Sequence, residues 1–239
     1  GIVFKAFDSS LDRMVALKTL LPKFVKDKDG VGRFLREAKL LAKLHHPNIV
    51  GGIDAGISHG IYYYVMEYLE GEGLDRRIKR EAPIPWPEAL HILRPVALAL
   101  DHAHQNGLIH RDIKPANIFL TKAGTIKLLD LGMARFISEQ GTMLTMTGCT
   151  VGTPLYLSPE QATGVRDIDI RTDLYALGIT LYEMLKGTPP FTGSDPLVIL
   201  HQHLTKDIVF EHLDLPPDLL TLGHHLTQRD RANRYATPA

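Results

Sequence analysis

One polar loop constrains the fold of this chain more than any other feature of its sequence. The loop His110–Asn117 reads HRDIKPAN and is followed by the apolar run Ile118–Leu120 and by an Asp-Leu-Gly triplet that begins at Asp130. We expect Asp112 and Asn117 to lie on one loop between short strands, and Asp130 to end the next short hairpin beside them. Two carboxylates and one amide would then converge on one cleft, and such oxygen ligands suit a hard cation such as Mg²⁺.

The loop and the triplet resemble the H-R-D-x-K-x-x-N catalytic loop and the metal-binding D-F-G motif of the protein kinase family. The resemblance implies that Asp112 accepts the proton of an acceptor hydroxyl and that Lys114 neutralises charge at the γ-phosphate. It implies that Asn117 and Asp130 hold Mg²⁺, or Mn²⁺ in its place, against the phosphates of ATP. Lys114 favours Ser/Thr acceptors, because tyrosine-specific members usually differ at this point. A surface loop whose charges only pair with one another is the alternative, and the presence of both motifs argues against it.

The run Val15–Lys18 resembles the V-A-I-K strand whose lysine contacts the α- and β-phosphates. Because side chains alternate along a strand, Lys18 and Ala16 should face the cleft together. A buried amine needs a counterion, and Glu37, on a helix predicted over Phe34–Leu44, matches the family's ion-pair glutamate. Alone, the tetrapeptide is a common strand, and its position before the catalytic loop gives it weight.

The other residues of the predicted ATP pocket rest on weaker motifs. Gly1 and Val3 resemble the tail of the Gly-rich loop, and the rest of that loop is absent, so we expect these 239 residues alone to bind ATP weakly or not at all. Tyr64–Leu69 resembles the hinge between the lobes, although an ordinary core strand is equally compatible with it. The implied pocket comprises Gly1, Val3, Ala16, Lys18, Glu37, Met66, Glu67, Leu69 and Phe119, with Glu67 and Leu69 acting through their main chains.

A polar stretch from residue 138 to 160 is similar to the activation segment of protein kinases. It ends in Gly-Thr-Pro and Ser-Pro-Glu motifs, with Ser158 where the family usually has alanine. The resemblance implies that Thr153 helps to recognise a Ser/Thr acceptor. It also implies that Glu160 forms a buried, structural ion pair with Arg234.

Phosphorylation of this stretch is a further expectation. Arg111 precedes the catalytic aspartate, and an added phosphate can order a loop through arginine contacts. The candidates are Thr145, Thr147 and Thr150. A flexible loop with incidental threonines is the alternative.

Three residues are expected to support the catalytic loop. His110 and Arg111 belong to the motif itself, and Asp173 matches the helix aspartate that anchors the loop backbone in the family. An N-terminal helix cap is the competing explanation for Asp173, and both can hold. Leu131 replaces the usual phenylalanine and is expected to pack under the helix that carries Glu37.

Hydrophobic periodicity predicts two lobes. A small sheet with one helix should come first, and a mainly helical lobe should follow. Together with the resemblance to protein kinases, this implies an α+β fold class, a bilobal protein-kinase-like fold without its first strand, with an N-lobe expected at 1–66, a hinge at 67–71 and a C-lobe at 72–239. The predicted strands are 2–7, 14–20, 49–53 and 61–66, and the predicted helices are 34–44, 88–105, 172–185, 196–204 and 218–226.

Charge and composition exclude other classes. The 27 Lys and Arg residues balance the 27 Asp and Glu residues, so no net field attracts nucleic acid or an acidic membrane. No apolar stretch approaches the roughly 20 residues of a membrane span, and the single cysteine favours a reducing compartment. We expect a cytoplasmic location, and the abrupt start at Gly1 suggests a fragment, which could be the cytoplasmic part of a membrane-anchored protein. The 12 histidines do not have the spacing of a zinc site.

The resemblance covers essentially the whole chain, and bacterial receptor-type Ser/Thr kinases are the most similar members. It implies transfer of the γ-phosphoryl group of Mg·ATP to a protein Ser/Thr hydroxyl, with dimerisation for trans-autophosphorylation as a further expectation. Two alternatives remain. A pseudokinase or scaffold would be expected to lose a motif residue such as Lys18 or Asp112, and a small-molecule phosphotransferase of related fold would lack the Ser-Pro-Glu segment.

Overall fold

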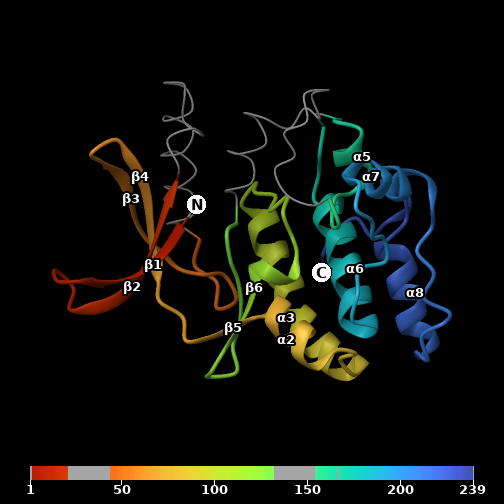
Figure 1. Cartoon of the computed structure of the whole chain (residues 1–239), viewed down its shortest axis with the longest axis horizontal. Helices are drawn as coiled ribbons and strands as arrows, with labels where there is room; N and C mark the ends of the chain where they lie inside the picture. The colour runs from red at the N-terminus through yellow and green to blue at the C-terminus, as the bar shows by residue number, and fades with distance from the viewer. Residues whose placement is uncertain (1, 21–43, 132–153, 166, 239) are drawn as a thin grey trace.

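The computed structural model describes residues 2–20, 44–131, 154–165 and 167–238, and Figure 1 shows two lobes. The N-terminal lobe is an antiparallel sheet, and helices dominate the C-terminal lobe, so the predicted α+β bilobal class is confirmed. The strands of the first sheet lie in the order β1 (Ile2–Asp8), β2 (Arg13–Leu20), β4 (Ile61–Glu67) and β3 (Gly52–Ser58). A second sheet between the lobes has the order β5 (Gly71–Gly73), β6 (Ile118–Thr121) and β7 (Ile126–Leu128).

The four helices of the C-terminal lobe for which bounds were predicted begin and end near the predicted residues, and the helices at 74–81 and 159–162 had no predicted bounds. The long helix starts at Trp86 rather than Glu88 and stops, as predicted, before Asn106 and Gly107, where Gly107 has a φ of 74°. The helices are α2 (Leu74–Glu81), α3 (Trp86–Gln105), α5 (Pro159–Ala162), α6 (Arg171–Lys186), α7 (Pro196–Thr205) and α8 (Pro217–Leu226), with 3₁₀ turns η2 (Pro115–Asn117) and η3 (Arg231–Asn233).

One predicted strand has the wrong bounds, and the difference bears on the site. The strand predicted over Ile49–Ile53 runs instead from Gly52 to Ser58 as β3, and Ile49 forms a single parallel bridge with Leu128. The amide of Val50 donates to the carbonyl of Leu128 at 3.0 Å. Ile49 and Val50 are buried, so their hydrophobic character reflects packing against β7. This bridge fastens the N-terminal sheet to the strand that leads to Asp130. The predicted helix over 34–44 lies outside the described residues except for Leu44, which is buried.

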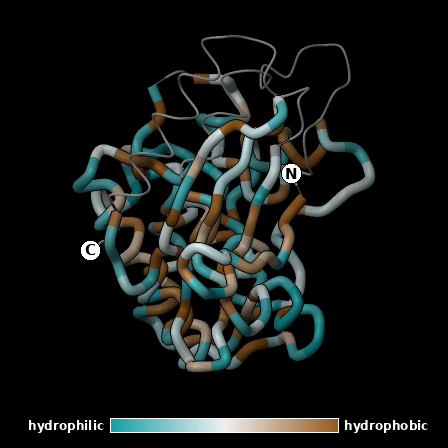
Figure 2. Tube along the Cα trace, turned by 90° about the vertical axis from the view of Figure 1, so that its left-hand side faces the viewer, coloured by the Kyte–Doolittle hydropathy of each residue, from teal (hydrophilic) through white to brown (hydrophobic). Residues whose placement is uncertain are grey.

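Helix α6 is the centre of the C-terminal core. All but three of its residues are buried, and the buried ones lie between Thr172 and Leu185 on all sides of the helix. Gly178 lets α8 approach it, because a Cβ there would lie 2.6 Å from a side-chain carbon of Thr227. Figure 2 shows hydrophobic stretches running through the interior of the trace and hydrophilic ones at many outer loops. Helix α6 is therefore packed on most of its surface by the rest of the lobe.

A second cluster of buried side chains surrounds His203 on α7. His203 is fully buried, its Nδ1 atom lies 2.9 Å from the hydroxyl of Tyr175, and its ring meets the ring of Phe191 edge to face. Burial lowers the pKa of His203 from 6.5 to about 4. The folded protein therefore holds this histidine in its neutral form at neutral pH.

We expect His203 to make the protein less stable as the pH falls. Its pKa is lower in the folded state, so the unfolded state binds the proton first, and stability is lost between pH 6.5 and about pH 4. The full effect is about 3 kcal/mol. Denaturant unfolding across this pH range should show a shallower pH dependence for His203→Gln than for the parent, whatever the stability of the variant at pH 7. The exposed His201 on the same helix provides the control, since His201→Gln should keep the parent's pH dependence. Equal pH dependence in all three proteins would contradict the assignment.

Candidate catalytic and nucleotide-binding site

Asp112 and its partners form a compact polar group at the end of the catalytic loop. The Nζ atom of Lys114 lies 2.9 and 2.7 Å from the two carboxylate oxygens of Asp112. Asn117 donates through Nδ2 to the backbone carbonyl of Asp112 at 2.7 Å and to its Oδ2 atom at 3.1 Å. The side chain of Asp112 is 44% exposed, whereas Asn117 is buried. A carboxylate that is oriented by hydrogen bonds and remains accessible to solvent can accept a proton from a molecule that approaches from solvent.

Helix α6 supports the backbone of this loop through Asp173. The Oδ2 and Oδ1 atoms of Asp173 accept hydrogen bonds from the backbone amides of His110 and Arg111, both at 2.7 Å. Asp173 is fully buried, and burial raises its pKa, while the two amide donors and the charge of Arg111 oppose that rise. The residue at the N-cap position is Ile170, so Asp173 does not serve as the cap of α6.

The buried ring of His110 connects the predicted catalytic loop to the residue before Asp130 of the predicted metal-binding motif. Its Nε2 atom lies 2.8 Å from the carbonyl of Leu129, and its Nδ1 atom accepts from the amide of Asp112 at 3.3 Å. In these contacts Nε2 faces an acceptor and Nδ1 faces a donor. The backbone of Asn117 also contacts Leu129, the residue that follows β7, because the carbonyl of Asn117 accepts a hydrogen bond from the amide of Leu129 at 2.8 Å. The position of Asp130 is thus tied to the position of Asp112.

Lys18 and Asp130 meet between the two lobes. The Nζ atom of Lys18, on β2, lies 2.6 Å from the Oδ2 atom of Asp130, and the two side chains are 14% and 29% exposed. The predicted counterion Glu37 lies outside the described residues. Among the described residues, Asp130 takes the place of a counterion. Leu131 is buried in the main core, and the helix under which it was predicted to pack lies outside the described residues.

Several predicted ATP-pocket residues lie on the strands around Lys18. Met66 is buried and pairs with Ala16 across β4 and β2, while Val3 pairs with Lys18 across β1 and β2 and is 55% exposed. Leu69 packs against the core. Gly1 lies outside the described residues, and Phe119 lies on β6, opposite Gly73 of β5.

Glu67, at the end of β4, has contacts that the sequence did not indicate. Its amide donates to the carbonyl of Gly51 at 2.9 Å, so only its carbonyl could serve an adenine edge. Its Oε1 atom accepts from the amide of Gly51 at 2.8 Å and lies 2.6 Å from the Nζ atom of Lys127. The Glu67 side chain therefore links the start of the predicted hinge to Lys127 on β7.

The end of the predicted activation segment is fixed by a buried ion pair. Arg234 contacts both carboxylate oxygens of Glu160, at 2.7 and 2.9 Å, and Thr172 donates to Oε1 at 2.7 Å. Burial alone would raise the pKa of Glu160, but the hydrogen bonds and charge of Arg234 outweigh it and hold the pKa below its ordinary value. The predicted residues Thr145, Thr147, Thr150 and Thr153 lie outside the described residues.

Gln161 is a site residue that the motifs did not include, although the sequence carries a signal for it. Ser158 and Gln161 form a reciprocal capping box at the start of α5. The pattern Ser-Pro-Glu-Gln is a standard capping-box sequence, so this role was readable from the sequence. The Nε2 atom of Gln161 also donates to the carbonyl of Arg111 at 3.0 Å, a contact that no local pattern predicts.

The chemistry of these donors fits a magnesium nucleotide. Both hydrogen bonds of the Asn117 side chain use its amide nitrogen, so its amide oxygen is the atom that could coordinate a cation. Asp130 would supply a carboxylate oxygen and Lys18 a positive charge for the phosphates. No group of three or more His, Cys, Asp or Glu among the described residues is arranged as a metal cage. Mg²⁺ does not require one, because it usually keeps several waters and binds through one or two carboxylates and the phosphates.

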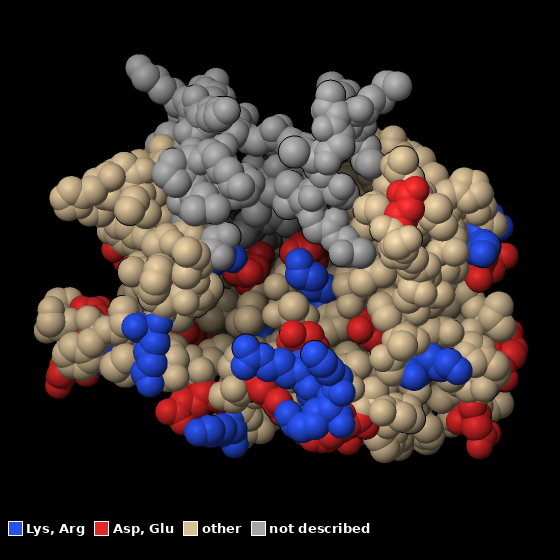
Figure 3. Space-filling model, in the orientation of Figure 1, with Lys and Arg blue, Asp and Glu red and all other residues tan. Residues whose placement is uncertain are grey.

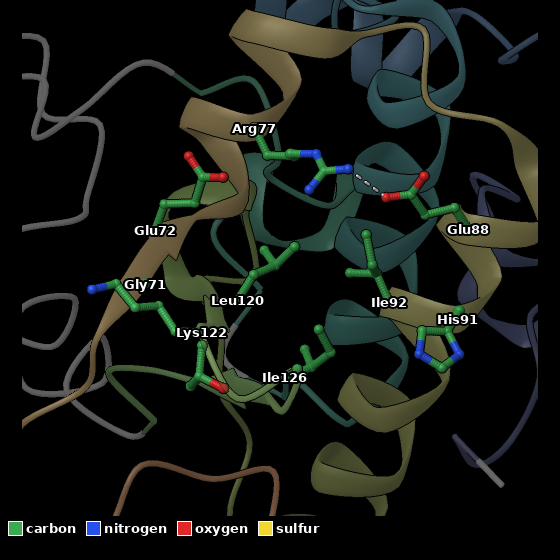
Figure 4. Close-up of a pocket in the computed structure, with 11 residues that line it drawn as sticks. Gly71, Glu72, Arg77, Glu88, His91, Ile92, Leu120, Lys122 and Ile126 are labelled. Atoms are coloured by element: carbon green, nitrogen blue, oxygen red, sulfur yellow. Dashed lines mark hydrogen bonds and ion pairs between the residues drawn. The ribbon is translucent and has the colours of Figure 1, made fainter.

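A cavity of about 570 Å³ lies elsewhere, between α3 and the β6–β7 hairpin (Figure 4). Its lining combines the apolar Ile92, Leu120 and Ile126 with the ion pair between Arg77 and Glu88, whose atoms are 2.8 Å apart. None of Lys18, Asp112, Asn117 and Asp130 lines it, so we assign it no part in the chemistry.

Charges of both signs are mixed on the surface near this cavity. Figure 3 shows Lys and Arg side chains close to Asp and Glu side chains on the lower part of the face. On α2, Arg80 pairs with Glu72 and Glu81, and Arg77 pairs with Glu81.

No described helix is both long enough and apolar enough to cross a bilayer.

Comparison with known proteins gives a consistent result. Residues 1–237 match the family model described as protein kinase domain. Serine/threonine-protein kinase PknB of Mycolicibacterium smegmatis is 39% identical over 244 residues, which cover 99% of this chain and 39% of that protein. Probable serine/threonine-protein kinase CPE1738 of Clostridium perfringens is 40% identical over 240 residues, which cover 99% of this chain and 35% of that protein. This chain therefore spans well under half the length of these curated relatives.

Solved structures agree with the family match. The crystal structure of the Mycobacterium tuberculosis PknI kinase domain has a TM-score of 0.77 and 29% sequence identity to this chain. The alignment covers 99% of this chain and 86% of that one. A structure of a mutant of the same domain has a TM-score of 0.76.

Proposed function

Because this chain belongs to the protein kinase domain family, we propose that it is the catalytic domain of a protein Ser/Thr kinase. In this proposal it transfers the γ-phosphoryl group of Mg·ATP to a Ser or Thr hydroxyl of a protein. The observation that carries the proposal is a continuous set of contacts between the motif residues. Asp112 contacts Asn117, the backbone of Asn117 contacts Leu129, and the next residue, Asp130, contacts Lys18.

Each motif residue has one proposed role in this reaction. Asp112 accepts the proton of the acceptor hydroxyl, and Lys114, which contacts Asp112, offsets the charge that develops on the transferred group. Asn117 and Asp130 hold the metal ions, and Lys18 orients the phosphates. When bound, Mg·ATP supplies the phosphoryl group and the charge that neutralises its oxygens. Catalysis by this chain is then mainly positioning and electrostatic stabilisation.

The proposal also includes the lobe boundaries, the adenine contacts, the metal ion, the location and the oligomeric state. We place the lobes at 1–66 and 72–239 with the hinge at 67–71, and the adenine against Val3, Ala16, Met66 and Leu69. We propose Mg²⁺ as the natural ion with Mn²⁺ as a substitute, a cytoplasmic location, and dimerisation for trans-autophosphorylation at Thr145, Thr147 or Thr150. Mass mapping of phosphate after incubation with ATP tests the last point, and phosphate confined to other segments would contradict it.

A label-transfer assay tests the function itself. The whole natural polypeptide that contains this sequence should be incubated with γ-labelled ATP and Mg²⁺ and offered proteins, Ser/Thr peptides, Tyr peptides and small-molecule acceptors such as aminoglycosides. We expect label on Ser or Thr of protein acceptors, and we expect Lys18→Met to reduce transfer by at least about 100-fold because the phosphates lose their orienting charge. Label on small molecules alone, or no transfer at all, would refute the proposal.

A further inference from the structure

Gln161 joins two parts of the chain that are far apart in sequence. It lies in the short helix α5, at the end of the predicted activation segment, and its Nε2 atom donates to the backbone carbonyl of Arg111 at 3.0 Å. The peptide group that contains this carbonyl is the one that leads into Asp112. A side chain of the segment therefore contacts the backbone that carries the proposed catalytic base.

The orientation of the Gln161 amide is set by Ser158. The Oε1 atom of Gln161 accepts from the amide of Ser158 at 3.0 Å and lies 3.2 Å from its hydroxyl. Since the oxygen is used in this way, the nitrogen must face Arg111. Alanine at position 158, the residue usual in the family it resembles, would keep the amide contact but remove the hydroxyl. Ser158 thus strengthens the orientation that Gln161 needs.

The peptide group between Arg111 and Asp112 is held at both ends. Gln161 holds its carbonyl, and the ring of His110 accepts from its amide at 3.3 Å. Arg111 itself has a φ of 65°, in the left-handed region that non-glycine residues adopt rarely and only where the surroundings impose it. Without the Gln161 contact, one of the two restraints on this peptide plane is lost. The carboxylate of Asp112 is attached directly to that plane.

We propose that Gln161 is a positioning residue for Asp112, and that it couples the end of the activation segment to the catalytic base. The proposal rests on the proposed kinase function. It assigns Gln161 no contact with the nucleotide or the acceptor. Its loss should therefore lower kcat and leave the KM for ATP nearly unchanged.

Two substitutions separate the catalytic contact from the helix cap. Gln161→Glu keeps an oxygen for Ser158 but places a second oxygen against the carbonyl of Arg111, so the cap survives and the contact becomes repulsive. We expect kcat to fall about 10- to 100-fold, with the KM for ATP changed less than about twofold. Gln161→Met loses both contacts and should show a similar loss of kcat together with lower thermal stability. Gln105→Glu makes the same change at an exposed position of α3, where the amide donates to Asp101 and not to the loop, and should keep the parent's kcat.

Two readouts distinguish positioning from a structural role. The carboxyl group introduced by Gln161→Glu can donate to the Arg111 carbonyl when it is protonated. The kcat of this variant divided by that of the parent should therefore rise as the pH falls from about 8 to about 6, whereas the same ratio for Gln161→Met should stay flat. Amide hydrogen exchange of residues 110–117 should be faster in both variants than in the parent and in Gln105→Glu.

The outcomes separate this inference from the proposed function. An active parent with unchanged kcat in Gln161→Glu, or with equal and pH-independent losses in both variants, would overturn the inference and leave the kinase assignment intact. A parent that transfers no phosphate would overturn the kinase assignment, and hydrogen exchange at 110–117 would then decide alone whether Gln161 orders the loop.

Discussion

Asp112→Asn is expected to lower the rate constant for phosphoryl transfer by about 10²- to 10⁴-fold, the usual contribution of a positioned general base. The asparagine has the same shape and can still contact Lys114 and Asn117, but it cannot accept the proton of the acceptor hydroxyl. Nucleotide binding should change little, because the proposed phosphate and metal contacts lie at Lys18, Asn117 and Asp130. Single-turnover kinetics with a protein acceptor measures the rate, and a nucleotide titration measures the binding.

A matched control is available in the same lobe. Asp101 lies on α3, and its carboxylate accepts an exposed hydrogen bond from Gln105 at 2.7 Å. Asp101→Asn makes the same chemical change away from the site and should leave the rate within about twofold of the parent. If Asp112→Asn retained half of the parent's rate while Asp101→Asn behaved as expected, Asp112 would not be the base.

Arg234→Met is expected to lower the free energy of unfolding by about 3–5 kcal/mol, because it leaves the buried carboxylate of Glu160 without its counterion. Glu160 would keep Thr172 as a donor, and the backbone carbonyls of Gln228 and Arg171, which now accept from Arg234, would lose a partner. Because the pair holds the pKa of Glu160 below its ordinary value, its contribution is present at neutral pH and lost as the pH falls through that lowered value. Urea unfolding at pH 7 gives the difference directly.

Two further variants test the reason for this loss. Arg231→Met breaks an exposed pair with Asp167, whose side chain is 89% exposed, and should cost less than about 1 kcal/mol. Adding Glu160→Gln to Arg234→Met removes the stranded charge and should recover part of the stability. A loss for Arg234→Met no larger than that for Arg231→Met would mean that burial does not strengthen this pair.

Most of the fold could be predicted because its signals are local. The β1–β2 hairpin follows from two short apolar runs around a polar turn, and α3 follows from its apolar spacing and the Asn106-Gly107 stop. The predicted strand bounds Ile49–Ile53 were wrong for a physical reason. Buried apolar residues in an irregular segment that packs on another strand have the same pattern as a short strand, and only the position of Leu128 distinguishes the two.

The candidate site could be predicted only in part. The motif resemblance identified Asp112, Asn117 and Asp130. Asp112 and Asn117 contact each other and are only five residues apart in the sequence. The resemblance placed Lys18 in the same cleft but named Glu37 as its partner, so it did not predict the ion pair with Asp130. It also did not predict that Gln161 would reach Arg111, because such contacts join segments far apart in the chain whose pairing depends on the whole fold. The buried His203 was also missed, since a histidine within a helix does not reveal its surroundings.

The central claim is that Lys18, Asn117 and Asp130 together form one binding site for a metal-bound nucleotide, and that Asp112 lies beside this site. Anomalous diffraction from crystals of the whole natural polypeptide with Mn²⁺ and a non-hydrolysable ATP analogue tests it most directly. We predict metal peaks coordinated by the Asp130 carboxylate and the Asn117 amide oxygen, with Lys18 turned from Asp130 towards the phosphates. Ordered nucleotide and metal bound elsewhere, with the Lys18–Asp130 pair still intact, would contradict the account.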